Sequence, residues 1–372
     1  MAIIKGRRFF VVNGPVDPGE GDAIEITVTF ASAPSSVSSA FPKMKFNKSK
    51  AILMEFDDDS PSVLTAYDRL KTTYYTDGCG NNKNYSLGLA LNAKNNFNNA
   101  EWGADYPGKT TFAQAIALIP FGLDIMNHSY YHEPTGNYPQ PADNWTFPQK
   151  NFIEMDNFIK LRYNNYKANA LVVPTNYTGY QLEAQSNGYL FGSSEGTFDG
   201  LTPYPAQFNA VGAIDNMPKL PFKAIKRTFS DNWTSGGPHF TALTALFASS
   251  SVDYFEIGSH GIGDGVNFNT WIDSIVSQGG DNILFQSMRE FMEYKHLKEY
   301  VTKNQVVNGN TVKITLDYST VPNQNISWYD LSLLLTSDKA ITNVSINRSD
   351  FTLSYNATTK LINVKKRKTE WV

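Results

Sequence analysis

The segment that decides the fold is Ala51-Ile-Leu-Met-Glu-Phe-Asp-Asp-Asp-Ser-Pro61. Its first six residues are almost entirely apolar, and a short apolar run bounded by turn-forming residues predicts a buried strand. The Ser-Pro pair that ends it is a helix cap with proline at the first helical position. The following residues repeat apolar side chains at helical spacing, at Val63, Tyr67 and Leu70. A buried strand that leads into a helix is the repeating unit of a parallel α/β fold.

The same alternation of strands and helices continues from residue 49 to residue 303. Further strand candidates lie at residues 121–126, 170–173, 223–229, 254–257 and 282–285. Helical patterns separate or follow them, at residues 150–166, 240–249, 270–276 and 288–300. This α/β pattern predicts a parallel sheet, most economically closed into a (β/α) barrel. The last of these helices is charged, and its His296 is expected at the surface.

Two flanking regions differ from this pattern. Residues 1–48 contain an alternating stretch, Ala23–Phe30, that predicts a strand, and a small polar linker follows it. One or two strands bury too little to form a core alone, so this N-terminal β arm is expected to dock on another surface. Residues 304–372 contain short strands separated by Asn, Ser and Thr turns, which predicts a small C-terminal β-sandwich. The expected domains are therefore 1–48, 49–303 and 304–372.

Composition narrows the class of protein. Of the 372 residues, 41% are hydrophobic, 13% are aromatic and only 18% are charged, which argues against intrinsic disorder. A net charge of −3 without a basic stripe argues against nucleic acid as the main partner. No apolar run approaches the roughly 20 residues that span a membrane. The one cysteine, Cys79, excludes an intrachain disulfide framework and a cysteine-rich zinc site.

Two clusters of polar residues directly follow predicted strands. Asp57 and Asp58 follow the first strand, and His128 and His132 follow the strand that ends at residue 126. One helical turn between the histidines would place both imidazoles on one face, as a divalent metal requires. Adjacent strand residues point to opposite faces, so Asp57 and Asp58 share a site only where the chain leaves strand geometry. Two histidines and one carboxylate form a first-row metal site with open positions for water and substrate.

The pairing of Phe56-Asp57-Asp58 with His128-Ser129-x-x-His132 resembles the polysaccharide deacetylases, the NodB-homology or carbohydrate esterase family 4 group. The first two motifs of that family are T-F-D-D-G and H-[ST]-x-x-H. The resemblance covers roughly residues 49–303 and implies a distorted (β/α) barrel that binds one divalent ion. Zinc is the expected ion, with cobalt and nickel as alternatives. The resemblance implies Asp57 as the catalytic base and Asp58, His128 and His132 as the metal ligands.

Later segments resemble the family more loosely. The strand Asp253–Ser259 ends before His260, which the resemblance implies is the general acid. Ser230-Asp-Asn-Trp233 is similar to a further family motif and implies that Asp231 orients this histidine. Two positions depart from the family pattern: Asp59 stands at a glycine position, and the stretch Leu171–Thr178 lacks the arginine that pairs with the catalytic aspartate.

Together these features imply a hydrolase that removes acetyl groups from a polysaccharide by N- or O-deacetylation with metal-activated water. A backbone N–H near Tyr177 is expected to help stabilise the oxyanion, and Trp102 or Trp145 to stack on sugar rings. The alternative is a carbohydrate-binding or structural protein with impaired catalysis. The missing arginine and the aspartate at position 59 motivate that alternative.

The expected setting is extracellular, at a cell surface or in a phage virion. The N-terminus lacks the long apolar core of a secretory signal, so either a signal was removed or the protein leaves its cell by another route. One setting is a secreted bacterial enzyme written without its leader. The other is a bacteriophage virion protein that modifies host surface polysaccharide, with the N-terminal arm bound to a docking partner.

Overall fold

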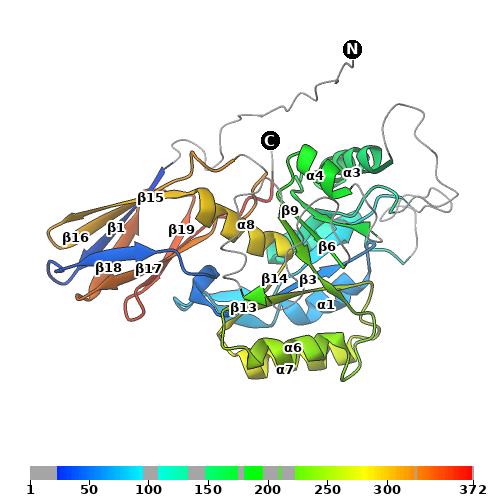
Figure 1. The fold of residues 1–372 in the computed structure, drawn as a ribbon, viewed down its shortest axis with the longest axis horizontal. Coiled ribbons are helices and arrows are strands. Elements are labelled where there is room, and N and C mark those ends of the chain that lie inside the picture. Colours follow the sequence, from blue (N-terminus) through cyan, green and yellow to red (C-terminus); the bar gives the residue numbers. More distant parts are fainter. Residues whose placement is uncertain are drawn as a thin grey trace, which may run out of the picture.

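The computed structural model describes residues 23–94, 108–132, 147–174, 180–195, 209–210, 223–322 and 325–370. These residues form an α/β body and a β-sandwich, with helix α8 (Met288–Tyr300) between them (Figure 1). The α/β body contains every candidate site residue that the structure describes. Its sheet therefore decides how those residues meet.

Strand β3 (Lys50–Phe56) is the centre of the body, and its seven residues are all buried. It pairs in parallel with β13 (Asp253–Ser259) along its whole length. On its other edge it pairs first with β14 (Ile283–Gln286) and then with β6 (Gly88–Leu91), again in parallel. A strand buried on both faces needs a continuous apolar run rather than alternation. The strand predicted over residues 51–56 is confirmed.

The sheet curves into a ring. From β6 it continues in parallel through β7 (Asp124–Asn127), β8 (Ala170–Val172), β9 (Phe191–Ser194) and β11 (Lys223–Lys226). A single residue, Arg227, separates β11 from β12 (Thr228–Phe229), and β12 pairs in parallel with β13. The segment 223–229 thus connects the two ends of the sheet, through β9 and β13, and nearly closes the ring. The short strand β10 (Asn209–Ala210) pairs antiparallel with β13. This strand order confirms the expected distorted (β/α) barrel.

Helices cover the outside of the barrel. They are α1 (Ser62–Leu70), α2 (Phe112–Leu118), α3 (Phe147–Arg162), α4 (Tyr180–Ser186), α6 (Pro238–Ala248) and α7 (Val266–Gly279), with the 3-10 turn η2 (Ile119–Phe121). A second 3-10 turn, η1 (Lys45–Asn47), instead contacts the strands Leu331–Ser337 and Leu361–Lys365. Helix α7 buries one apolar face, formed by Phe268, Trp271, Ile272 and Ile275. It lies beside α6 along one side of the body (Figure 1). None of the helices in the described ranges is both long and apolar enough to span a membrane.

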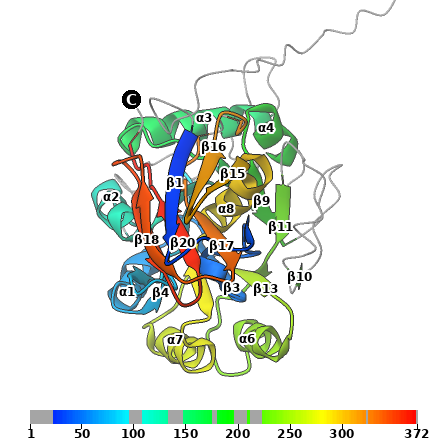
Figure 2. The ribbon, with the colours of Figure 1, turned by 90° about the vertical axis from the view of Figure 1, so that its left-hand side faces the viewer.

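Strands from both ends of the described chain build the sandwich. One sheet has the order β15 (Thr302–Asn308), β16 (Thr311–Asp317), β1 (Ala23–Phe30) and β18 (Ile341–Ile346). The other has the order β19 (Thr352–Asn356), β20 (Leu361–Lys365), β17 (Leu331–Ser337) and β2 (Val37–Ala40). Figure 2 shows the blue strand β1 among these later strands. Because alternate residues of β1 are buried in this sandwich, the N-terminal arm and the C-terminal strands share one core.

Helix α8 is charged in sequence and nevertheless buried. Its Glu290 forms an ion pair with Lys45, which also lies 3.1 Å from the Asp330 carboxylate of the sandwich. His296 is 3% exposed, and its ring packs on Phe191 of β9. The expected surface position of His296 is wrong because α8 contacts both the barrel strand β3 and the sandwich strand β17. Ion pairs at this junction, such as that between Lys45 and Glu290, stabilise charges that water would otherwise hydrate.

Candidate metal centre and active site

The loop after β3 carries the first two site residues. Asp57 still bonds as a strand residue, with its N–H donating to the carbonyl of Ser259 at 2.9 Å. Asp58 and Asp59 then have φ angles of 62° and 55°, in the left-handed region. This change of geometry lets neighbouring carboxylates share a site: Asp57 Oδ2 and Asp58 Oδ1 each lie 3.6 Å from Nε2 of His128. The sequence predicted that the chain must leave strand geometry here.

The loop after β7 carries His128 and His132. Their ring centroids are 5.1 Å apart. The connection between them is not helical, since Ser129 and His132 have φ angles of 68° and 78°. The N–H of His132 donates to the Ser129 hydroxyl at 2.8 Å. The expected helical turn is wrong, and a loop held by the serine side chain brings the imidazoles together instead.

Asp58, His128 and His132 form one cluster. Oδ1 of Asp58 lies 3.6 Å from Nε2 of each histidine, and the three donor atoms all lie within 4.8 Å of one another. The Nδ1 atom of His128 bonds the carbonyl oxygen of Val172 at 2.8 Å. A histidine held through one ring nitrogen in this way presents the other nitrogen to a metal.

The donor atoms fit a divalent cation. Nε2 of His128 and Oδ1 of Asp58 are buried and make no hydrogen bond to any residue in the described ranges. Buried polar atoms nearly always have a partner, so two unbonded atoms in one cluster point to a ligand between them. Burial lowers the pKa of His128 to about 4, so its imidazole is neutral at pH 7, the form that binds metals. Two imidazoles and a carboxylate suit zinc.

Asp57 is held by a guanidinium group. Nη1 and Nη2 of Arg227 donate to Oδ1 and Oδ2 of Asp57 at 2.8 and 2.6 Å. Burial acts to raise the pKa of the Asp57 carboxyl, but the positive charge of Arg227 outweighs it and lowers that pKa. Asp57 is therefore a carboxylate at neutral pH.

Arg227 corrects an inference from the sequence. The stretch Leu171–Thr178 has no arginine, but the barrel supplies one from the junction of β11 and β12. Asp57 thus has a guanidinium partner although the stretch that resembles the family motif provides none. Gly258 of β13 makes room for this arginine, because a Cβ at that position would lie 2.5 Å from Nη1. The available signal in the sequence was one arginine inside the predicted strand 223–229.

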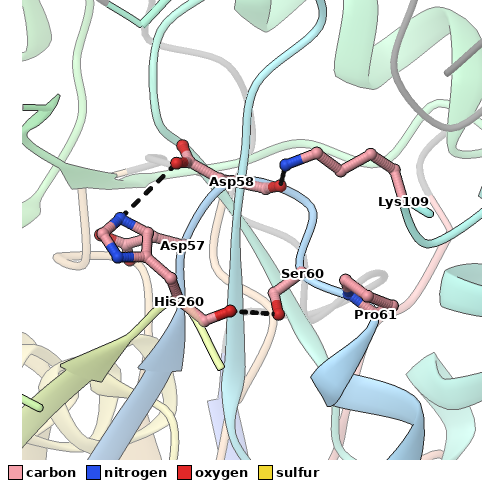
Figure 3. Close-up of a pocket in the computed structure, with 6 residues that line it drawn as sticks. All are labelled: Asp57, Asp58, Ser60, Pro61, Lys109 and His260. Carbon is pink, nitrogen blue, oxygen red and sulfur yellow. Dashed lines mark hydrogen bonds and ion pairs between the residues drawn. The ribbon is translucent and has the colours of Figure 1, made fainter. Parts of the chain in front are cut away.

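His260 follows β13 and faces Asp58 (Figure 3). Its Nδ1 lies 2.9 Å from Oδ2 of Asp231, and its backbone N–H donates to Oδ1 of the same carboxylate at 2.7 Å. Its Nε2 lies 3.6 Å from Oδ2 of Asp58. The His260 side chain is 49% exposed, so a substrate can reach it. The structure thus joins Asp231 to His260 in the way the sequence motifs imply.

A pocket of about 320 Å³ opens over these groups (Figure 3). Its walls are Asp57, Asp58, Ser60, Pro61, Lys109 and His260. Lys109 reaches Asp58 from the side opposite His260, and its ammonium donates to the Asp58 carbonyl at 2.6 Å. Trp102, Trp145 and Tyr177, for which sugar-stacking and oxyanion roles are expected, lie outside the described residues.

Fold and site together define an α/β barrel protein in which three side chains that could hold a divalent cation, Asp58, His128 and His132, converge where the strands give way to loops. No family model matches the chain, and no curated protein matches its sequence. A similar solved structure is that of a mutant CE4 family pseudoenzyme with restored enzymatic activity. The two chains are 12% identical with a TM-score of 0.36, and the match covers 66% of this chain and 68% of that one. Another is a family 4 carbohydrate esterase from Bacillus anthracis, which is 12% identical with a TM-score of 0.36. That match covers 68% of this chain and 86% of the esterase. We infer nothing further from likenesses of this size.

Proposed function

We propose that this protein is a metal-dependent hydrolase that removes acetyl groups from a polysaccharide. The observation that carries the proposal is the convergence of Asp58, His128 and His132 beside two further polar pairs. Asp57 is paired with Arg227, and His260 is paired with Asp231. This arrangement supplies a cation site, a carboxylate base and an oriented imidazole around one pocket. Such a set serves hydrolysis by water without a covalent nucleophile.

Asp58, His128 and His132 would hold the divalent ion, with zinc expected and cobalt or nickel chemically suited to the same donors. When bound, such an ion polarises the acetyl carbonyl and lowers the pKa of water. The protein contributes the placement of its donors. The Val172 carbonyl orients His128, and the left-handed turn orients Asp58.

The proton transfers fall to Asp57 and His260. Asp57, kept ionised by Arg227, accepts a proton from the attacking water as the water oxygen bonds to the acetyl carbon. Protonated His260 donates from Nε2 to the departing nitrogen or oxygen as its bond to the acetyl carbon breaks. The Asp231 carboxylate on Nδ1 fixes the orientation of the His260 ring. The products are acetate and a free amine or hydroxyl on the glycan.

Acetate release from N-acetylated and O-acetylated glycans tests the proposal. The wild-type protein is expected to release acetate, to lose this activity after chelation and to regain it with zinc. Asp57→Asn should lower kcat by about 10²–10⁴-fold because it removes the base. Arg69→Met is a suitable control, because Arg69 pairs with Asp273 at the surface. Activity that survives both thorough metal removal and His128→Ala would exclude the proposed mechanism.

The competing proposal, a glycan-binding or structural protein with impaired catalysis, loses one of its two motivations because Arg227 supplies the missing cation. Glycan binding without acetate release, unchanged by Asp57→Asn, would support it. The expected extracellular or virion setting stays a prediction. Mass spectrometry of purified virions, together with the neighbouring genes, would distinguish a virion protein from a secreted enzyme.

A further inference from the structure

The turn that carries Asp58 has an unfavourable backbone conformation. Asp58 and Asp59 are consecutive non-glycine residues with positive φ, where the Cβ atom crowds the backbone. Conformations of this kind persist only where surrounding contacts hold them. The side chain of Asp59 is not such a contact, because both of its buried carboxylate oxygens lack a hydrogen bond to any residue in the described ranges. Within the turn, the Ser60 N–H donates to the carbonyl of Asp57 at 3.2 Å, and the further contacts come from outside the turn.

Two adjacent residues of another loop supply these contacts. The Lys109 ammonium donates to the carbonyl of Asp58 at 2.6 Å. The Thr110 N–H donates to the carbonyl of Asp59 at 3.0 Å, and the Thr110 hydroxyl donates to the carbonyl of Ser60 at 2.9 Å. Three consecutive carbonyls of the turn are thus bonded by two consecutive residues. We call Lys109 and Thr110 the 109–110 clamp.

The clamp matters for the cation site because its contacts fix the backbone from which the Asp58 side chain extends. Oδ1, the atom nearest both histidines, has no hydrogen bond within the described part of the chain. Carboxylate ligands are usually fixed by hydrogen bonds to the carboxylate itself, and here the backbone contacts take that role. Thr110 is fully buried, so its hydroxyl has no water to bond if Ser60 moves.

We propose that Lys109 and Thr110 are positioning residues that hold Asp58 in the geometry needed to bind a divalent cation. This proposal rests on the proposed function insofar as Asp58 is a metal ligand. It assigns the stability of the turn to the clamp and not to the residue at position 59. Replacing Asp59 by glycine should therefore leave cation binding near the wild-type value, whereas weakening the clamp should not.

Zinc affinity of the full-length protein, measured by competition with a chelating dye, is the first test. Lys109→Met and Thr110→Val are expected to raise the zinc Kd by about tenfold to a hundredfold, as loss of outer contacts to metal ligands does. Thr110→Ser keeps the hydroxyl and should restore the affinity. Lys313→Met is the matched control, since Lys313 pairs with Glu25 on the sandwich surface. Thermal melting of the metal-free proteins checks that each variant folds.

Amide hydrogen exchange of residues 57–60 in the metal-free protein is the second test. Lys109→Met and Thr110→Val should speed exchange there, while Asp59→Gly should not restore slow exchange in either variant. Unchanged exchange in both clamp variants overturns the proposal, whether or not the wild type binds zinc. Zinc binding without acetate release would contradict the proposed function and leave the clamp intact.

Discussion

Asp57 and Arg227 form an enclosed charge pair, with side chains 3% and 4% exposed. A bidentate guanidinium fixes both the position and the charge of a carboxylate. Because burial alone favours the protonated acid, it is the arginine that keeps Asp57 ionised, as the proposed role of a base requires. Burial acts to lower the pKa of Arg227, but the Asp57 carboxylate, together with the nearby carboxyls of Glu55 and Glu256, outweighs it and raises that pKa.

Arg227→Met should therefore raise the pKa of Asp57. The acid limb of the kcat/KM profile is expected to move to higher pH, because Asp57 would stay protonated over a wider range. At neutral pH, kcat/KM should fall by about 10-fold or more. The measurement is the pH dependence of acetate release between pH 4 and 9.

The surface variant Arg69→Met controls for loss of an arginine as such and should leave the acid limb in place. An unchanged acid limb in Arg227→Met would show that Arg227 does not set the ionisation of Asp57. Circular dichroism of both variants would separate this outcome from misfolding.

At the scale of elements, α8 shows how a charged helix becomes a core helix. Lys45, from η1, is 1% exposed and pairs with Glu290 of α8 and with Asp330 beside β17. These carboxylates outweigh the effect of burial and raise the pKa of Lys45. The lysine thus joins three segments that are far apart in the chain. Such buried pairs cost much when one partner is removed.

Lys45→Met is expected to lower the free energy of unfolding by about 3–5 kcal/mol, because Glu290 and Asp330 would be left buried without their cation. Urea denaturation followed by circular dichroism measures this change. Lys313→Met breaks an exposed pair and should cost at most about 1 kcal/mol. Equal losses in the two variants would contradict the role given to the junction.

At the scale of the whole molecule, a hairpin of the α/β body fastens the sandwich. The hairpin consists of β4 (Tyr74–Thr76) and β5 (Asn82–Asn84), and Asp77 lies in its turn. Oδ2 of Asp77 accepts from the Ser354 hydroxyl at 2.8 Å and from the Lys365 ammonium at 2.5 Å. Burial opposes ionisation, but these bonds and those from Asn81 outweigh it and lower the pKa of Asp77 to about 2.

The depressed pKa of Asp77 predicts acid-sensitive stability. Its pKa in the unfolded chain is about 3.9, so the carboxylate stabilises the fold fully above that value and loses this contribution as pH falls toward 2. The contribution is about 2.5 kcal/mol. Asp77→Asn should remove it, and the variant should show a flatter dependence of unfolding free energy on pH between 5 and 2.

Asp350→Asn is the matched control for this experiment. Bonds from Arg348 lower the pKa of Asp350 to about 2 as well, but its side chain is 38% exposed and water screens its partners. Asp350→Asn should therefore change the pH dependence of the unfolding free energy clearly less than Asp77→Asn does. A pH dependence that is identical in wild type and Asp77→Asn would refute the assignment.

Local sequence determined several parts of this protein. The apolar run before Asp57 predicts a strand that the structure contains, and the strand–helix alternation predicts the barrel. Spacing and likeness to family motifs indicate the aspartate pair, the two histidines and the Asp231–His260 pair. These features are predictable because they are local. The periodicity of a strand or helix, and the polar residues that follow a strand, can be read within a short stretch of sequence.

Tertiary structure alone decided the rest. Arg227 pairs with an aspartate 170 residues earlier, because β12 and β3 both flank β13 in the closed barrel. Strand β1 pairs with β16 and β18, near the other end of the chain, and α8 is buried because it contacts both the barrel strand β3 and the sandwich strand β17. Local patterns show which face of an element is apolar, whereas its neighbours follow from strand order and packing, which no short stretch of sequence contains.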